Sequence, residues 1–277
     1  MKMTRLLVAF VFILASLLSA HNVFSQADKG FVGVKACMTC HPVKGVKNEE
    51  TLKIWGDHKH SNLDRGCEAC HGPGAEHSAL GPKQLLDLKK KKGDLKITVN
   101  RKSELCGECH KQTDDKSIAL VSDVLVKGQQ QYTEMLYNKK ATLKMTCVMC
   151  HDAHASSNTD EGIKRKCLDC HKGKYMVEVK IAAMSDLSCE DCHMPYAGKN
   201  ASDETKGGYT KGDVRSHIFG ISADPKYKLN DGAGHAKLNS DGYARLTVEM
   251  TCYACHKTGK APDMTREQLL KSAAKIH

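Results

Sequence analysis

The sequence has few of the residues that usually build a large apolar core. Aromatic residues make up 5% of its 277 positions, and Trp55 is the one tryptophan. The longest apolar run, residues 6–18, is shorter than the roughly 20 residues of a comfortable membrane span. Because Lys2 and Arg5 precede this run and small residues follow at 25–27, we expect residues 1–27 to be a cleaved export signal, with an uncleaved anchor as the alternative.

Cysteine never occurs outside one pattern. All fourteen cysteines belong to seven copies of Cys-x-x-Cys-His, numbered here in chain order. They are motif 1 (Cys37, Cys40, His41), motif 2 (Cys67, Cys70, His71), motif 3 (Cys106, Cys109, His110), motif 4 (Cys147, Cys150, His151), motif 5 (Cys167, Cys170, His171), motif 6 (Cys189, Cys192, His193) and motif 7 (Cys252, Cys255, His256).

This spacing has a chemical reason. Two thiols three residues apart can form thioether bonds to the two vinyl groups of one haem, and the next imidazole then lies under the iron. Structural zinc sites combine cysteine pairs two by two, which leaves one of seven pairs stranded and gives the histidines no regular role. A disulfide framework explains neither the spacing nor the histidines. The pattern therefore predicts seven covalently bound haem c groups, with the motif histidines as proximal iron ligands.

The fold is expected to depend on these cofactors. Removal of residues 1–27 leaves about 250 residues, or about 36 for each haem, so the porphyrins must supply much of the apolar core. We expect a mostly irregular chain with short α-helices, a multihaem cytochrome c fold organised around a chain of stacked haems. Residues 28–110 are expected to form an N-terminal segment with three haems, and residues 111–277 a C-terminal segment with four.

Local patterns predict few regular elements. Residues 118–137 are a candidate helix, and Thr265 with Gln268 resembles a capping box that opens a second helix near the carboxy terminus. Alternating apolar residues within 177–181 and 246–250 favour short strands or extended segments, whereas glycine-rich, polar residues 198–208 and 230–242 favour loops.

The positive charge does not require a nucleic-acid partner. The formal net charge is +10, and it falls to about +1 once the signal is removed and seven ferric haems with ionised propionates are added. The basic side chains are therefore mainly countercharge for the cofactors. The lysine run at 89–92 is either a solvated loop or a docking site for an acidic redox partner.

The second axial ligand decides what each iron can do. A second histidine saturates the haem for electron transfer, whereas an open position admits a substrate. Seven non-motif histidines lie beyond the signal: His58, His60, His77, His154, His217, His235 and His277. Their number equals the number of motifs, which favours two histidine ligands for each haem iron. His154 is too close to His151 along the chain to reach the other face of the same porphyrin, so it should serve a neighbouring haem. Met194 is kept as an alternative ligand, and one haem can use only one of His58 and His60.

Two segments resemble known multihaem cytochromes c. The segment Cys67-Glu-Ala-Cys-His-Gly-Pro-Gly-Ala-Glu-His77 resembles the tetrahaem cytochrome that accepts electrons from hydroxylamine oxidoreductase, and periplasmic decahaem cytochromes; this implies that His77 is a distal ligand. Residues 189–196, followed by 213–217, are similar to part of the pentahaem nitrite reductases, which implies the same for His217. The lysine-ended haem motif of those reductases is absent here, and the octahaem hydroxylamine oxidoreductases have one more haem. Both departures weaken an enzymatic interpretation.

These features lead us to expect an exported heptahaem electron carrier of anaerobic respiration, in the periplasm, or else extracellular or associated with the outer membrane. Its partners would be a quinol-linked membrane cytochrome as donor and a terminal reductase or outer-membrane complex as acceptor, with no nucleic acid and no membrane span after signal cleavage. One alternative is a reductase for nitrite, hydroxylamine or a sulfur oxyanion, with one open haem near Arg215 or Tyr196. The other is a subunit of an extracellular cytochrome filament, in which His277 would ligate haem across subunits.

Overall fold

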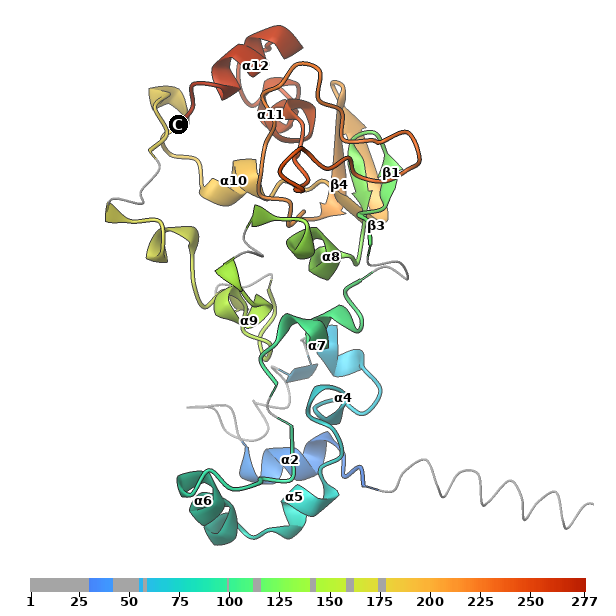
Figure 1. The fold of residues 1–277 in the computed structure, drawn as a ribbon, viewed down its shortest axis with the longest axis vertical. Coiled ribbons are helices and arrows are strands. Elements are labelled where there is room, and N and C mark those ends of the chain that lie inside the picture. Colours follow the sequence, from blue (N-terminus) through green and yellow to red (C-terminus); the bar gives the residue numbers. More distant parts are fainter. Residues whose placement is uncertain are drawn as a thin grey trace, which may run out of the picture. The chain divides into compact units, whose positions relative to one another are not determined.

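The computed structural model describes residues 30–41, 55–56, 59–98, 100–111, 116–139, 143–157, 162–173 and 178–277. The expected export signal and His58 lie outside these residues. The chain divides into unit 1, Met1–Asn100 with Ala153–Gly162, and unit 2, Arg101–Asp152 with Ile163–His277 (Figure 1). Within the described ranges, every helix falls short of the length and apolar character that crossing a bilayer requires.

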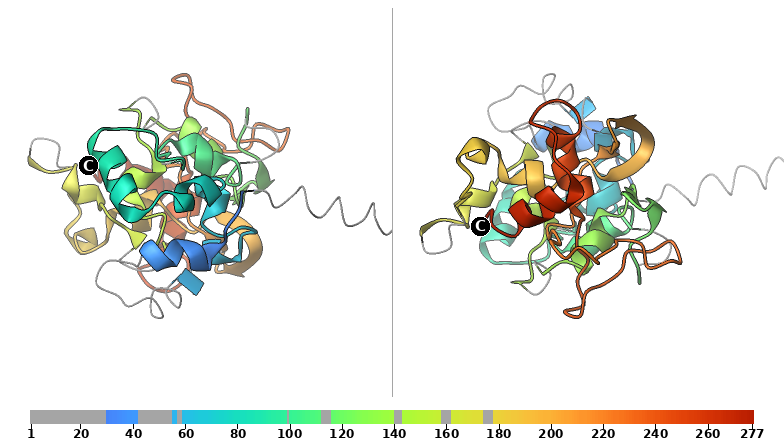
Figure 2. Two further views of the ribbon diagram at one scale, coloured as in Figure 1. Left: turned by 90° about the horizontal axis from the view of Figure 1, so that it is seen from below. Right: turned by 90° about the horizontal axis from the view of Figure 1, so that it is seen from above.

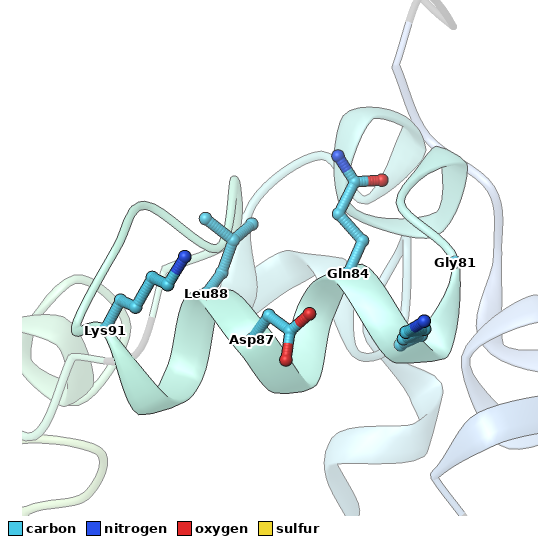
Figure 3. A pocket seen from close by; sticks show the side chains of 6 residues that line it. Gly81, Gln84, Asp87, Leu88 and Lys91 are labelled. Atoms are coloured by element: carbon cyan, nitrogen blue, oxygen red, sulfur yellow. The ribbon is translucent and has the colours of Figure 1, made fainter.

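Unit 1 consists of short helices joined by irregular chain. They are α2 (Val34–Cys40), the 3-10 helix η1 (Lys59–Asn62), α4 (Glu68–His71), α5 (Ala75–Ala79) and α6 (Pro82–Lys90). Glycines apart, Glu68 is the one buried residue among the described residues of this unit. A shallow hollow runs along α6 (Figure 3), and its lining contains neither cysteine nor histidine: it consists of Gly81, Lys83, Gln84, Asp87, Leu88 and Lys91. Unit 1 therefore has no apolar protein core in its described part.

Unit 2 contains a small four-stranded sheet that the sequence patterns did not predict. Its strands are β1 (Leu120–Ser122), β2 (Leu125–Lys127), β3 (Gly198–Lys206) and β4 (Tyr209–Val214), in the order β1-β2-β3-β4. The outer pairs are antiparallel and the central β2–β3 pair is parallel, with Val126 opposite Gly198. The sheet thus joins two stretches of chain that are far apart in sequence (Figure 1).

Both sequence predictions for these stretches need correction. The helix expected over 118–137 is wrong in its first half, since the β-branched residues there pair as β1 and β2; only α8 (Gln131–Leu136) is helical. The loop expected over 198–208 is wrong because it forms the first strand and the turn of a hairpin. Gly207 and Gly208 connect paired Lys206 and Tyr209 with φ of 58° and 86°, the backbone of a two-residue hairpin turn that glycine favours.

The other helical elements of unit 2 are α7 (Ser103–Gly107), α9 (Cys147–Cys150), η4 (Cys167–Asp169), η6 (Ala182–Met184), α10 (Cys189–His193), α11 (Val248–His256) and α12 (Arg266–Ala273). Helices α11 and α12 lie side by side (Figures 1 and 2). The short strand or extended segment expected over 246–250 is wrong from Val248 onwards, where helix α11 begins, whereas Thr247 before it is extended. Of the short strand or extended segment expected at 177–181, the described residues 178–181 form no strand, and Ile181 is extended.

Two local predictions for unit 2 are confirmed. The Thr265 hydroxyl accepts a hydrogen bond from the Gln268 amide at 3.3 Å, and the Gln268 side chain accepts one from the Thr265 amide at 2.7 Å. This reciprocal capping box opens α12. Residues 230–242 are irregular apart from isolated bridges.

An apolar core packs between the sheet, α11 and the irregular chain that joins β4 to α11. It consists of Ile118, Val126, Ala197, Ile218, Leu229, Ala236, Ala244, Leu246 and Met250. Ile218 and Leu246 are fully buried. Because Ile218 is next to His217, this core fixes the backbone that carries one of the candidate iron ligands. The fold is therefore mixed, with short helices and a small sheet.

Candidate haem sites

Each Cys-x-x-Cys-His motif lies on a helical turn. In motifs 1 to 5, the amide of the histidine donates to the carbonyl oxygen of the first cysteine at 2.8–3.0 Å. Positions i, i+3 and i+4 share one face of a helix, so both thiols and the imidazole lie on the same side of the turn. This is the arrangement that thioether attachment beneath an axial histidine needs. All fourteen cysteines are described, and none of them forms a disulfide.

Four motif histidines each face one non-motif histidine. The ring centroids are 6.0 Å apart for His41 and His77, and 6.1 Å apart for His71 and His154. In unit 2, the separation is 6.1 Å for His151 and His217, and 5.7 Å for His193 and His277. The structure therefore brings together four proximal and four distal histidines that the sequence predicted as iron ligands.

This spacing fits a haem iron. A metal–nitrogen bond is about 2 Å and a ring centre lies about 1 Å further, so imidazoles on opposite sides of one metal have centroids roughly 6 Å apart. Rings in direct face contact would lie at the roughly 3.5–4 Å of van der Waals contact. The four pairs are thus spaced for two axial nitrogens with one iron between them.

Hydrogen bonds orient six of the imidazoles. In each, Nδ1 faces a carbonyl oxygen, which can only accept, so Nδ1 carries the proton and Nε2 offers its lone pair to a metal. The five backbone contacts are His71 to Thr98 (2.7 Å), His77 to Leu95 (2.8 Å), His193 to Phe219 (2.7 Å), His256 to Pro262 (2.7 Å) and His277 to Glu178 (3.3 Å). The sixth is His110 to Oε1 of the Gln131 side chain at 3.3 Å.

Electrostatics also suit metal binding at the pair of His151 and His217. Burial, with a smaller effect of His151, lowers the pKa of His217 to about 4. Burial, followed by the nearby His110 and Lys164, also lowers the pKa of His151. Both rings are therefore neutral at pH 7, which is the form that ligates metals. Nδ1 of His217 is buried without a hydrogen-bond partner among the described residues, as expected of a polar group that a cofactor would satisfy.

The backbone around His217 is held by buried polar side chains. The Glu134 carboxylate in α8 accepts hydrogen bonds from the His217 amide and from the Ser216 hydroxyl, the latter at 2.8 Å. The Asn138 side-chain amide donates to the His217 carbonyl oxygen at 2.8 Å. Burial raises the pKa of Glu134 to about 7, although these hydrogen bonds act in the opposite direction. No sequence pattern pointed to Glu134, because its role depends on residues more than eighty positions away.

The other predicted distal ligands are His60 and His235, with His58 outside the described residues. His60 lies in η1. His235 lies in the irregular segment 230–236, where its amide donates to the Asp231 carboxylate at 3.1 Å. Neither His235 nor His256 has a ring contact with another histidine in the described part of the chain. The distal ligands of motifs 3, 5 and 7 therefore stay predictions.

Arg215 and Tyr196 were candidates for lining a substrate pocket. The Arg215 guanidinium donates to the carbonyl oxygens of Glu190 at 3.0 Å and Met194 at 2.8 Å, and its Cζ lies 4.6 Å from the Tyr196 ring centre. Lys211 contacts the same ring at 4.8 Å. Arg215 thus binds carbonyl oxygens at the carboxyl end of α10, in addition to the Met194 amide that already donates to Glu190.

Comparisons with known proteins point to one class. No family model matches the chain. Multiheme cytochrome MtrA of Shewanella baltica is 23% identical over 201 residues, which are 66% of this chain and 52% of MtrA. Dissimilatory sulfite reductase MccA of Wolinella succinogenes is 26% identical over 246 residues, 74% of this chain and 34% of MccA. Tetraheme c-type cytochrome CymA of Shewanella oneidensis is 28% identical over 138 residues, 50% of this chain and 72% of CymA. The relatives of this chain are multihaem c-type cytochromes.

These relatives support covalently bound haem in this chain. The chain spans about half the length of MtrA and about a third of MccA. Among solved structures, the octaheme sulfite reductase MccA of Wolinella succinogenes matches 75% of this chain with 40% of its own, at 17% identity and a TM-score of 0.45.

Proposed function

We propose that the chain is an exported heptahaem c-type cytochrome that relays single electrons from a quinol-linked membrane donor to a terminal reductase or outer-membrane conduit. The observation that carries the proposal is the set of four motif histidines that face a second imidazole at 5.7–6.1 Å. An iron ligated on both sides has no position for a substrate. When bound, haem supplies the one-electron chemistry. The two imidazoles would hold the haem in a fixed position and orientation.

The four distal histidines all come from beyond another motif. His77 follows motif 2 but faces motif 1, and His154 follows motif 4 but faces motif 2. His217 follows motif 6 but faces motif 4, and His277 follows motif 7 but faces motif 6. Each cross-connection ties one haem site to the chain segment of another. Within one unit, such ties hold neighbouring sites at set positions, which a relay between them requires.

Two backbone segments serve two haem sites at once. Residues 95–98 accept hydrogen bonds from His77, which faces motif 1, and from His71 of motif 2. Residues 217–219 carry the ligand that faces motif 4, and the Phe219 carbonyl oxygen accepts from His193 of motif 6. These contacts keep the imidazoles of two sites in fixed orientations, so that a change of oxidation state involves little movement. They support an order of transfer in which motifs 1 and 2 are neighbours, and motifs 4 and 6 are neighbours.

The distal ligands of the other three sites are assigned by elimination. Motifs 3, 5 and 7 need three distal ligands, and three non-motif histidines remain once the four pairs are made: His58, His60 and His235. We assign these histidines to those sites as part of the same proposal. The result is seven haems with two histidine ligands each.

A reductase is the second candidate function. It is favoured by the sulfite reductase MccA among the relatives, and by His256, which faces no second imidazole within the described residues. In this case the iron of motif 7 would take a sulfur oxyanion, nitrite or hydroxylamine. The filament alternative has less local support, because His277 meets His193 of its own chain.

Low-temperature EPR of the purified ferric protein, with haem content per chain measured on the same sample, tests the proposal. The relay predicts seven haems per chain, all low-spin, with spectra unchanged by sulfite, nitrite or hydroxylamine. One high-spin haem whose signal shifts with any of these anions or with hydroxylamine would replace the relay by the reductase. A haem count below seven would show that some motifs are not loaded.

A further inference from the structure

One buried carboxylate in unit 1 contacts three backbone amides from two separate parts of the chain. Glu68, within motif 2, is 3% exposed. Its Oε1 accepts hydrogen bonds from the amides of Val32 at 2.9 Å and Gly74 at 2.8 Å. Its Oε2 accepts from the amides of Gly33 at 2.8 Å and Val32 at 3.1 Å. Both oxygens are therefore occupied by donors that nothing else in the described chain satisfies.

Two of these amides lie at the starts of two helices. Gly33 directly precedes α2, the helix that carries motif 1 and ends beside His41. Gly74 directly precedes α5, the helix that carries His77. The amides at a helix start have no partner within the helix, and neither start has a side-chain cap of its own. A single carboxylate thus holds the starts of both helices whose histidines face each other at 6.0 Å.

The surroundings leave this carboxylate no room to move. A Cβ added to Gly74 would lie 3.1 Å from Oε1 of Glu68 and 3.2 Å from a methyl of Val32. Gly66 has φ of +51°, and a Cβ there would lie 2.2 Å from a methyl of Val34. Residues 30–34, 66–68 and 73–75 are therefore packed together closely around Glu68.

Apolar packing cannot replace these bonds in unit 1. Glu68 is its one buried residue apart from glycines, among the described residues. Loss of the carboxylate would leave buried amides unpaired, which costs more than the bond itself contributes. Of the backbone contacts between the two helix starts, the hydrogen bond from the Ala75 amide to the Gly30 carbonyl oxygen at 2.9 Å would then remain.

We propose that Glu68 is a positioning residue for the iron site of motif 1. From inside motif 2, its carboxylate determines where His41 and His77 meet, and it couples the geometry of the first two haem sites. The proposal rests on the proposed function, because it requires both imidazoles to ligate one haem iron. Glu68 itself touches neither imidazole.

The variants Glu68→Ala and Glu68→Gln test the proposal in the full haem-loaded chain. Glutamine keeps the size but turns one oxygen into an NH₂ group that faces amide donors, so it removes part of the set of bonds. In ferric EPR, Glu68→Ala should convert one haem equivalent from low-spin to high-spin, and Glu68→Gln a smaller fraction. Added imidazole should return this haem to low-spin, and the haem content per chain should not change.

Two further variants make the result specific. His77→Ala, which removes the ligand itself, should give the same high-spin signal and the same rescue by imidazole. Glu190→Gln is the matched control, because Glu190 occupies in motif 6 the position of Glu68 in motif 2, yet its side chain has no hydrogen bond in the described part of the chain. It should leave every haem low-spin.

The outcomes separate this proposal from the proposed function. A Glu68→Ala protein with all haems low-spin and spectra like the wild type overturns the role of Glu68. If Glu68→Ala yields no loaded protein, Glu68→Gln decides: a one-haem change supports the proposal, and a general loss of several haems overturns it. If His77→Ala alters no spin state, the histidine pairing at motif 1 is wrong, whatever Glu68 does.

Discussion

In unit 2, nine apolar residues form a buried core beneath a small sheet, whereas the described residues of unit 1 bury only one side chain larger than glycine, and that side chain is charged. Both units nevertheless bring motif and non-motif histidines to the same separation of about 6 Å. The comparison teaches that a haem site can be positioned in two ways. Unit 2 uses a protein core, and unit 1 uses backbone hydrogen bonds to Glu68.

The two units also share one structural feature, a buried glutamate. Each places a buried glutamate beside the backbone that leads to a non-motif histidine: Glu68 near the start of the helix with His77, and Glu134 on the amide of His217. In unit 2, the fully buried Ile218 adds apolar packing next to the ligand. Unit 1 lacks such packing in its described part, so its polar contacts contribute more to the position of the histidine.

The largest expected difference between the units concerns the haem-free chain. If the motif cysteines are replaced by alanine, residues 30–98 should exchange their amide hydrogens like an unfolded chain, because no apolar core remains there. The β3–β4 hairpin, α11 and residues near Ile218 should keep measurable protection. Hydrogen exchange followed by mass spectrometry, with the loaded protein as control, makes the measurement. Equal protection of the amide hydrogens in both units would show that the haem-free chain folds equally well in unit 1 and in unit 2.

A core substitution should affect unit 2 more than any single apolar change in unit 1. Leu246→Ala removes a fully buried side chain and should lower the free energy of unfolding by about 2–5 kcal/mol. Leu86→Ala, at a residue in α6 that is 58% exposed, should change it by less than about 0.5 kcal/mol. Denaturant unfolding of the two loaded proteins gives both values. A large effect at Leu86 would reveal apolar packing in unit 1.

Acid should affect unit 1 through Glu68. Burial tends to raise the pKa of Glu68, but the amides of Val32, Gly33 and Gly74, with Arg65, lower it below its ordinary value of 4.5 overall. The ionised form is therefore favoured by folding, so its stabilisation is complete above pH 4.5 and is lost as the pH falls through the lowered pKa. Spectra recorded from pH 6 downwards should show one haem losing low-spin character. Glu68→Gln should weaken this pH dependence, and an identical acid transition in that variant would contradict the assignment.

The smallest effect is expected at a similar carboxylate on the surface of unit 2. Asp213 accepts hydrogen bonds from the amides of Asn200 at 2.7 Å, Ala201 at 2.8 Å and Ser202 at 3.1 Å, as Glu68 does for its own three amides. Asp213 is exposed, and water can replace it. Asp213→Asn should therefore cost less than about 1 kcal/mol in unfolding experiments and leave every haem low-spin. A change of spin state would show that the hairpin supports a haem site.

Sequence patterns succeeded where the signal is contained in a few neighbouring residues. The capping box at Thr265 and Gln268 is present, and the irregular character of residues 230–242 was also foreseen. They failed for residues 118–127 and 198–206, because strand pairing between these distant stretches overrides local helix and loop preferences. They also missed Glu68 and Glu134, since a buried carboxylate looks like any surface glutamate until its amide partners are known.

The sequence by itself determined the seven Cys-x-x-Cys-His motifs and the set of histidines outside them. The reason is that thiols and proximal imidazole lie within one helical turn, so their geometry follows from spacing alone. Only the tertiary structure decided that His77 faces His41 and that His217 faces His151. These partners are distant along the chain, and their meeting depends on how Glu68 and the core around Ile218 fold the backbone between them.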